Sequence, residues 1–110
     1  MNADDVVAER RLEAVSPDGV RTPVVVSVGR PGPDPLSAHD DWRCPFRVTG
    51  LGDEVVGAAF GVDSLQALLL AVHKVRLELA ARAGAESVAL DWLGHPELGL
   101  TVEPHLPNPR

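Results

Sequence analysis

The chain has 110 residues, of which 10 are Lys or Arg and 16 are Asp or Glu, so its net charge at pH 7 is −6. Both halves of the chain are acidic, which argues against nucleic acid or an anionic membrane surface as a partner, because phosphate binding needs concentrated positive charge. The length suits one domain, and we expect residues 1–110 to form a single domain with an ordered core over residues 6–102 and a mobile tail over 103–110.

The single cysteine excludes an intramolecular disulfide framework and a zinc site built from several cysteines. The longest fully apolar run, Ala67–Val72, is far shorter than the ~20 residues that cross a bilayer. No basic segment followed by an apolar stretch opens the chain, so the sequence does not indicate export. These features predict a soluble, cytoplasmic protein.

Two strands are predicted near the N-terminus. Over Val6–Val15, alternate residues share one face, which is apolar except for Arg10 and therefore favours an edge strand. Ser16–Gly19 has the Pro and Gly of a tight turn, and a β-branched strand over Thr22–Val28 follows it. The pair predicts a first hairpin.

The middle of the chain predicts a long loop and a second pair of strands. Arg30–Asp41 contains three prolines and no apolar period, which is typical of a surface loop. Trp42–Thr49 alternates most clearly, with Pro45 indicating an edge strand or one that begins after a bulge. A short strand over Glu54–Phe60 runs back beside it.

A long helix is predicted over Ser64–Ala83. Asp63 has the N-cap position with Gln66 completing a capping box, and Gly84 is predicted to end the helix. The predicted buried stripe comprises Leu65, Leu68, Leu69, Val72, Val75 and Leu79. Leu70 and Leu77 fall off this stripe, so they either widen the buried face or meet another molecule.

The C-terminal part predicts a fifth strand or ordered extension over Ser87–Trp92, followed by His95–Val102 covering a sheet edge or the end of the helix. The fold class is therefore α+β. We expect a four-stranded, mainly antiparallel meander with one long helix packed on one face and a short C-terminal strand or arm.

Two segments carry a resemblance to a known family. Trp42–Gly50 has the pattern W-x-C-P-[FY], and Gly61–Leu68 has the pattern G-x-D-x-x-Q-A-L. With a Leu-Gly-rich tail after the helix, this order resembles a family of small uncharacterised bacterial proteins, over residues 6–102. The resemblance implies the strand-then-helix order and no activity, because the family is a domain of unknown function without assigned catalytic residues.

Two kinds of chemistry are weighed for the chain, and neither is favoured. His39, Asp40, Asp41 and Cys44 offer metal-ligand types, but one thiol at this spacing matches no zinc pattern, so we expect no metal and no cofactor. A nucleophilic Cys44 needs a base, and the candidates are His39, His73, His95 and His105. Because Cys44 shares a predicted face with two aromatic side chains, we interpret it as a residue of the hydrophobic core. We expect no catalytic residues.

The favoured function is a non-enzymatic protein-binding domain, such as an inhibitor or immunity-type partner of another bacterial protein. Its binding residues would come from the loop and the exposed sheet face: Asp40, Asp41, Arg43 and Arg47. A first alternative is a small-molecule-binding domain or minor enzyme with a pocket between helix and sheet near Trp42, Cys44 and His73. A second is a homodimeric structural accessory that pairs through Leu70 and Leu77.

Overall fold

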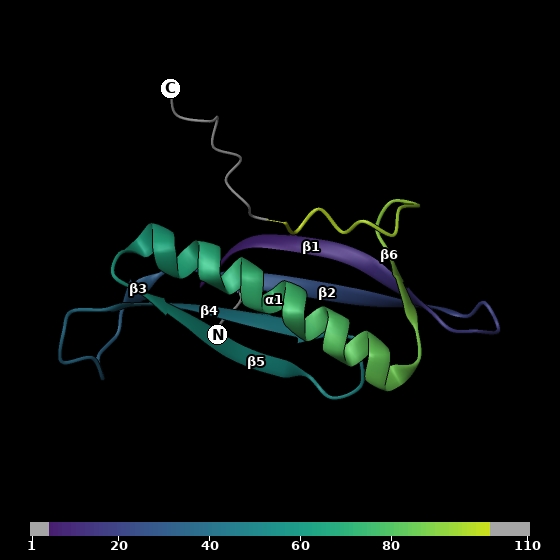
Figure 1. Ribbon diagram of the computed structural model, residues 1–110, viewed down its shortest axis with the longest axis horizontal. Helices are drawn as coiled ribbons and strands as arrows, with labels where there is room; N and C mark the ends of the chain where they lie inside the picture. Colours follow the sequence, from purple (N-terminus) through teal and green to yellow (C-terminus); the bar gives the residue numbers. More distant parts are fainter. Residues whose placement is uncertain (1–4, 102–110) are drawn as a thin grey trace, which may run out of the picture.

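The computed structural model describes residues 5–101 and shows one helix against one sheet (Figure 1). Val102 and the predicted tail over 103–110 lie outside the described residues. The elements in chain order are β1 (Val6–Val15), β2 (Arg21–Gly29), β3 (Gly32–Pro33), β4 (Trp42–Thr49), β5 (Val55–Gly61), α1 (Ser64–Glu86) and β6 (Ala89–Asp91). The α+β prediction is confirmed.

The four long strands form the predicted antiparallel meander, in the spatial order β1-β2-β4-β5. Two short strands bring the sheet to six: β6 pairs with the end of β1, and β3 pairs with the start of β4. The helix lies across β4 and β5, and the chain after β6 runs back along β1 (Figure 1). The core lies between these two coverings and the inner face of the sheet.

Pro45 lies in a central strand, so the edge-strand alternative for Trp42–Thr49 is wrong; the other alternative, a bulge, is closer, although the strand already begins at Trp42 and the bulge lies in its neighbour. Val28 pairs with Phe46 and Gly32 pairs with Arg43, which leaves an unpaired bulge between β2 and β3 opposite Pro45. The missing N–H of Pro45 faces this bulge, where no ladder hydrogen bond forms. The proline is therefore tolerated inside the sheet.

The Cys44 thiol compensates for the absent donor of its neighbour. Continuing the β2–β4 register by one residue places Gly29 opposite Pro45, which has no N–H to give. The Gly29 carbonyl instead accepts from Cys44 Sγ at 3.4 Å. Because an unpaired buried carbonyl costs free energy, the Cys-Pro pair has a structural explanation.

The helix packs on the sheet through a narrower and smaller stripe than the predicted one. Its buried residues are Ala67, Ala71, Val75 and Leu79, whereas Leu65 is 61% exposed. The reason is close approach: a Cβ on Gly61 of β5 would lie 2.6 Å from the Ala67 nitrogen. Alanine fits this gap where leucine does not, so Leu65 and Leu69 stay exposed, whereas Leu68 packs half-buried beside the core.

Both helix ends are capped. The Asp63 carboxylate accepts from the Gln66 N–H at 2.8 Å, as the capping prediction requires, and the Gln66 side chain accepts from the Val62 N–H at 2.7 Å. The predicted stop at Gly84 is wrong. The helix continues to Glu86 and ends at Ser87, whose left-handed backbone (φ 55°) lets its N–H and that of Val88 reach the last carbonyls.

The segment after β6 covers the half of the inner face that the helix leaves open. Leu98 and Leu100 pack against the core there. Arg10, which interrupts the apolar face of β1, holds this arm: its guanidinium lies 3.8 Å from the centre of the Trp92 ring and donates to the carbonyls of Leu98 and Gly99 at 2.7 and 3.2 Å. The Arg10 guanidinium is thus bound by this arm, whereas the sequence indicated only that β1 could be an edge strand.

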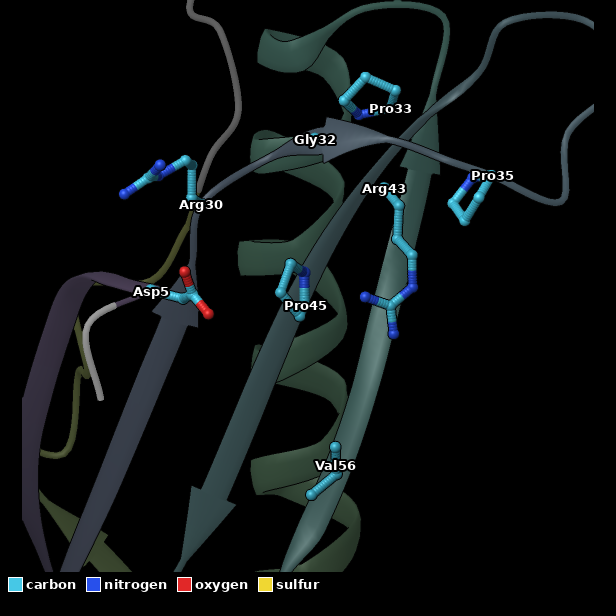
Figure 2. Close-up of a pocket in the computed structure, with 8 residues that line it drawn as sticks. All are labelled: Asp5, Arg30, Gly32, Pro33, Pro35, Arg43, Pro45 and Val56. Atoms are coloured by element: carbon cyan, nitrogen blue, oxygen red, sulfur yellow. The ribbon is translucent and has the colours of Figure 1, made fainter. Parts of the chain in front are cut away.

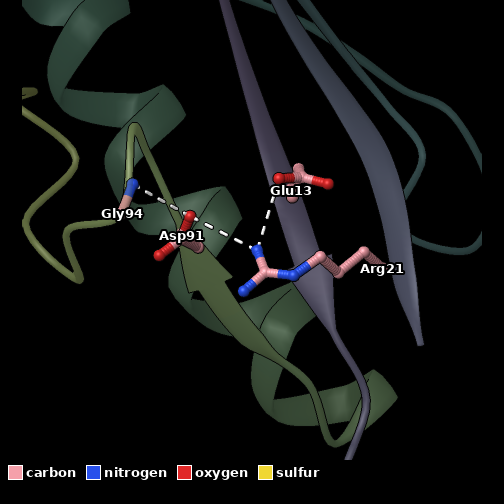
Figure 3. A network of polar contacts seen from close by, with 4 residues as sticks. All are labelled: Glu13, Arg21, Asp91 and Gly94. Atoms are coloured by element: carbon pink, nitrogen blue, oxygen red, sulfur yellow. Dashed lines mark hydrogen bonds and ion pairs between the residues drawn. The ribbon is translucent and has the colours of Figure 1, made fainter. Parts of the chain in front are cut away.

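A polar network ties β6 to the first hairpin (Figure 3). Arg21 contacts Glu13 at 3.3 Å and Asp91 at 3.5 Å, and Asp91 also accepts from the Gly94 N–H at 3.1 Å. Arg21 and Glu13 are about half exposed and Asp91 is 22% exposed, so we expect each ion pair to contribute at most about 1 kcal/mol. Their effect is to fix the direction in which the chain leaves the sheet.

Candidate functional site

The outer face of the sheet, away from the helix, carries the candidate site. No helix lies against it in the described part of the chain. Its residues alternate with the core residues of each strand, and on β4 and β5 they form the cross-strand pairs Arg43–Phe60, Pro45–Ala58 and Arg47–Val56. Val56 is 58% exposed and Phe60 is 48% exposed. An open face with apolar side chains of this size favours a binding surface.

Most charges on the outer face are paired with each other. Glu9 contacts Arg11 at 2.8 Å, Glu13 contacts Arg21 at 3.3 Å, and Glu54 contacts Arg47 at 2.7 Å. The predicted site residue Arg47 is therefore held by a neighbour along the chain.

Arg43 differs from the other arginines of this face. Its side chain is exposed and makes no hydrogen bond or ion pair within residues 5–101. A guanidinium in this state offers all its donors, in a planar fork that matches a carboxylate. Arg43 is the predicted site residue that the geometry supports best.

A shallow hollow of about 380 Å³ surrounds Arg43 (Figure 2). The Arg43 guanidinium extends along β4 and β5 between Pro45 and Val56, whereas the Arg30 side chain points away from it (Figure 2). Half of the lining residues are apolar, namely Pro33, Pro35, Pro45 and Val56, and the others are Gly32, the Asp5 carboxylate and the two arginines. Prolines lose little conformational freedom on binding, so the hollow is preorganised.

A second hollow of about 300 Å³ lies between Arg11, Pro23 and Leu93. The charged side chains that line it are Arg11, Glu13 and Asp91, and each of these is already in an ion pair. A charged ligand there would have to break an existing pair. A charged ligand that binds Arg43 would break no ion pair of this arginine within residues 5–101. We therefore place the candidate site in the hollow beside Arg43.

The two loop carboxylates predicted for binding have different surroundings. Asp41 accepts from the Ser37 hydroxyl at 2.9 Å and helps to close the Asp34–Asp41 loop, whose ends are joined by the Asp34 N–H and the Asp41 carbonyl. Asp40 is exposed, has a left-handed backbone (φ 58°), and makes no hydrogen bond or ion pair with another described residue. Asp41 is thus structural in this arrangement, and Asp40 is available to a partner.

The three predicted pocket residues lie in different environments. Trp42 is half-buried against the core, Cys44 is fully buried, and His73 is exposed on the helix, where its Nδ1 lies 3.3 Å from the Arg76 guanidinium. The hollows of about 380, 300 and 110 Å³ are lined by other side chains. The structure therefore does not assemble Cys44 and His73 into a nucleophilic pair.

We expect Cys44 to resist thiol reagents in the folded protein. Burial raises the pKa of its thiol, and the charge of Arg43 offsets only part of this effect. A raised pKa removes the reactive thiolate at neutral pH, and the closed packing denies access. Labelling with a maleimide followed by mass spectrometry should give no adduct until denaturant unfolds the chain. Rapid labelling that rises around neutral pH would show an accessible, activated thiol instead.

The described part of the chain contains neither a cluster of metal-ligating side chains nor a membrane-spanning helix. No three His, Cys, Asp or Glu side chains within residues 5–101 gather in an arrangement that could hold a metal ion. The helix in the same residues is not long and apolar enough to cross a membrane.

Two features of the structure were missed by sequence reasoning. The alternation of Val56, Ala58 and Phe60 was visible, but nothing in it told which side of the strand would stay open. Lys74 also escaped notice: it extends from the helix to β5 and donates to the Ala58 carbonyl at 3.0 Å. Neither the open side of β5 nor the Lys74 hydrogen bond is indicated by residues that are close together in the sequence.

Together, these features define a small α+β domain in which, over residues 5–101, one face of the sheet is covered and the other is open. The chain belongs to the family described as a domain of unknown function, DUF6968, whose sequence model matches residues 8–102. No curated protein and no solved structure matches the chain.

Proposed function

We propose that this chain is a non-enzymatic protein-binding domain that engages another bacterial protein through the outer face of its sheet. The observation that carries the proposal is Arg43, an exposed guanidinium without a protein partner in residues 5–101, set in a hollow that three prolines and Val56 help to line. One charged anchor surrounded by apolar, water-excluding contacts is the arrangement of binding hot spots.

The chemistry of the hollow indicates what it would accept. A guanidinium fork binds a carboxylate through two parallel hydrogen bonds, and the flanking prolines and Val56 favour an apolar neighbour. We therefore propose that the partner presents an Asp, a Glu or a C-terminal carboxylate next to an apolar side chain. Asp40, also exposed, would meet a basic group of the partner. An inhibitor or immunity-type role fits such a surface.

We also propose that the protein is cytoplasmic. Its support is compositional: the chain is acidic, and its one cysteine is free and buried. A reducing compartment suits such a thiol.

The test compares two charge reversals made in the tagged full chain. Arg43→Glu changes the open face, and Arg76→Glu makes the same charge change on the helix. Wild-type and Arg76→Glu proteins, purified gently from the host and examined by native mass spectrometry, should carry the same second protein. Arg43→Glu should lose it, with affinity falling at least about tenfold, as expected for an interface arginine. Equal recovery by all three would place the binding surface elsewhere.

A further inference from the structure

The free edge of β5 is occupied by a side chain of this same molecule. Lys74 of α1 donates to the Ala58 carbonyl at 3.0 Å, and its ammonium lies 5.9 Å from the centre of the Phe60 ring. It is the chain's one lysine. Lysine at a sheet edge opposes pairing with another strand, because a buried ammonium would lose its water.

The edge that Lys74 covers is long and regular. β5 has seven residues and pairs with β4 along its length, and within residues 5–101 no strand pairs with its other side. The Ala58 carbonyl points outward, since it accepts from Lys74. By the alternation of an antiparallel ladder, the N–H and C=O groups of Val56 and Phe60 also point outward. These groups form a template for another strand.

The side chains along this edge are self-complementary. If a second copy pairs antiparallel about Ala58, Val56 of each copy lies opposite Phe60 of the other, on the outer face. Val56 and Phe60 are 58% and 48% exposed in the single chain. Pairing would remove apolar surface of both side chains from water.

The same two-fold symmetry would also bring together exposed leucines of the two helices, which lie on the inner side of the sheet. Leu70, Lys74 and Leu77 lie at positions i, i+4 and i+7 and therefore share one helix face. The two leucines are 40% and 53% exposed. The two-fold axis that pairs the strands would bring Leu70 of one copy toward Leu77 of the other. Lys74 would meet its own counterpart at the axis, which places two like charges next to each other.

We propose that the β5 edge is a self-association surface for a second copy of this chain, and that Lys74 keeps it closed. The lysine occupies the central carbonyl acceptor and places like charges at the axis. When the charge is removed, two sheets join through β5 into one continuous sheet. A second copy is favoured over an unrelated strand because the apolar residues on both sides of the sheet repeat symmetrically around the same centre.

The test measures the oligomeric state of the full chain by sedimentation velocity. Lys74→Met keeps the aliphatic stem and removes the charge, and Arg76→Met is the matched control that removes a charge from the same helix. Wild-type and Arg76→Met proteins should be monomeric, whereas Lys74→Met should dimerise with a dissociation constant at least about tenfold lower, because juxtaposed like charges strongly oppose association. A monomeric Lys74→Met would overturn the proposal, and so would a wild-type dimer as tight as that of the variant.

A second variant locates the interface. Ala58→Pro removes an outward N–H and leaves the β4 ladder intact, because the N–H of Ala58 does not face β4. In the Lys74→Met background it should restore the monomer, with circular dichroism confirming that the chain is folded. A dimer that persists in this double variant would place the contact away from β5 and would contradict the proposal.

Discussion

Replacing Gly61 with alanine should lower the free energy of unfolding by about 2–3 kcal/mol, the cost of overpacking a tight core. The added Cβ would lie 2.6 Å from the Ala67 nitrogen and 2.9 Å from Gln66 Cβ. The first of these is backbone of the helix, so the clash cannot be relieved by rotating a side chain. The first turn of α1 would have to move away from the sheet.

Gly32→Ala is the matched control for this experiment. A Cβ at Gly32 meets no atom within 4 Å, so the change should stay within about 0.5 kcal/mol of wild type. Urea unfolding followed by circular dichroism gives both values, and the slope of the transition should not change if both variants remain two-state. A Gly61→Ala variant as stable as Gly32→Ala would contradict the close packing of helix on sheet.

Replacing Arg10 with methionine should destabilise the protein by about 2 kcal/mol and release the C-terminal arm. The substitution removes the hydrogen bonds to the Leu98 and Gly99 carbonyls and the contact with the Trp92 ring. Hydrogen exchange should therefore accelerate over residues 92–101. Exchange in β4 should change far less, because its cover is the helix.

The neighbouring arginine provides the control. Arg11 lies on the outer face and, among the residues that the structure describes, pairs with Glu9, so Arg11→Met should cost less than about 1 kcal/mol. A double-mutant cycle between Arg10→Met and Trp92→Leu should give a coupling free energy of about 1 kcal/mol. Equal effects of Arg10→Met and Arg11→Met, with no coupling to Trp92, would show that the arm is held by other contacts.

Much of the sheet could be predicted from the sequence because each long strand buries one face. Period-two alternation over Trp42–Thr49 and the turn residues at Ser16–Gly19 reflect local geometry, and the strands lie where these patterns indicate. The start of the helix could be predicted from the local sequence as well, because the side chains of Asp63 and Gln66 accept hydrogen bonds from backbone N–H groups close to them in the chain.

The buried face of the helix could not be predicted in the same way. Hydrophobicity favours the leucines over the alanines, whereas it is Gly61 of β5, lying against the Ala67 nitrogen, that lets the alanine face of the helix approach the sheet. Arg10 presents the same difficulty, because its partner Trp92 is distant in the sequence. Contacts of this kind depend on how the elements pack and leave no periodic signal.

The candidate site was predicted in part. The alternation of β4 correctly placed Arg43 and Arg47 on one exposed face, but their different states depend on Glu54, which follows the next turn and reaches back to Arg47. Cys44 was interpreted as core, and the structure adds its hydrogen bond to Gly29. Nothing in the sequence indicated that Lys74 would cover the edge of β5.

The measurement that tests the proposed binding face most directly is site-specific photo-crosslinking in the host cell. A photoreactive amino acid is placed at Val56 on the outer face, and in a separate protein at Leu65 on the helix, positions that are 58% and 61% exposed. The proposal predicts a crosslink from position 56 to one protein other than this chain, and none from position 65. The same crosslink from position 65, with none from position 56, would show that the sheet face is not the binding surface.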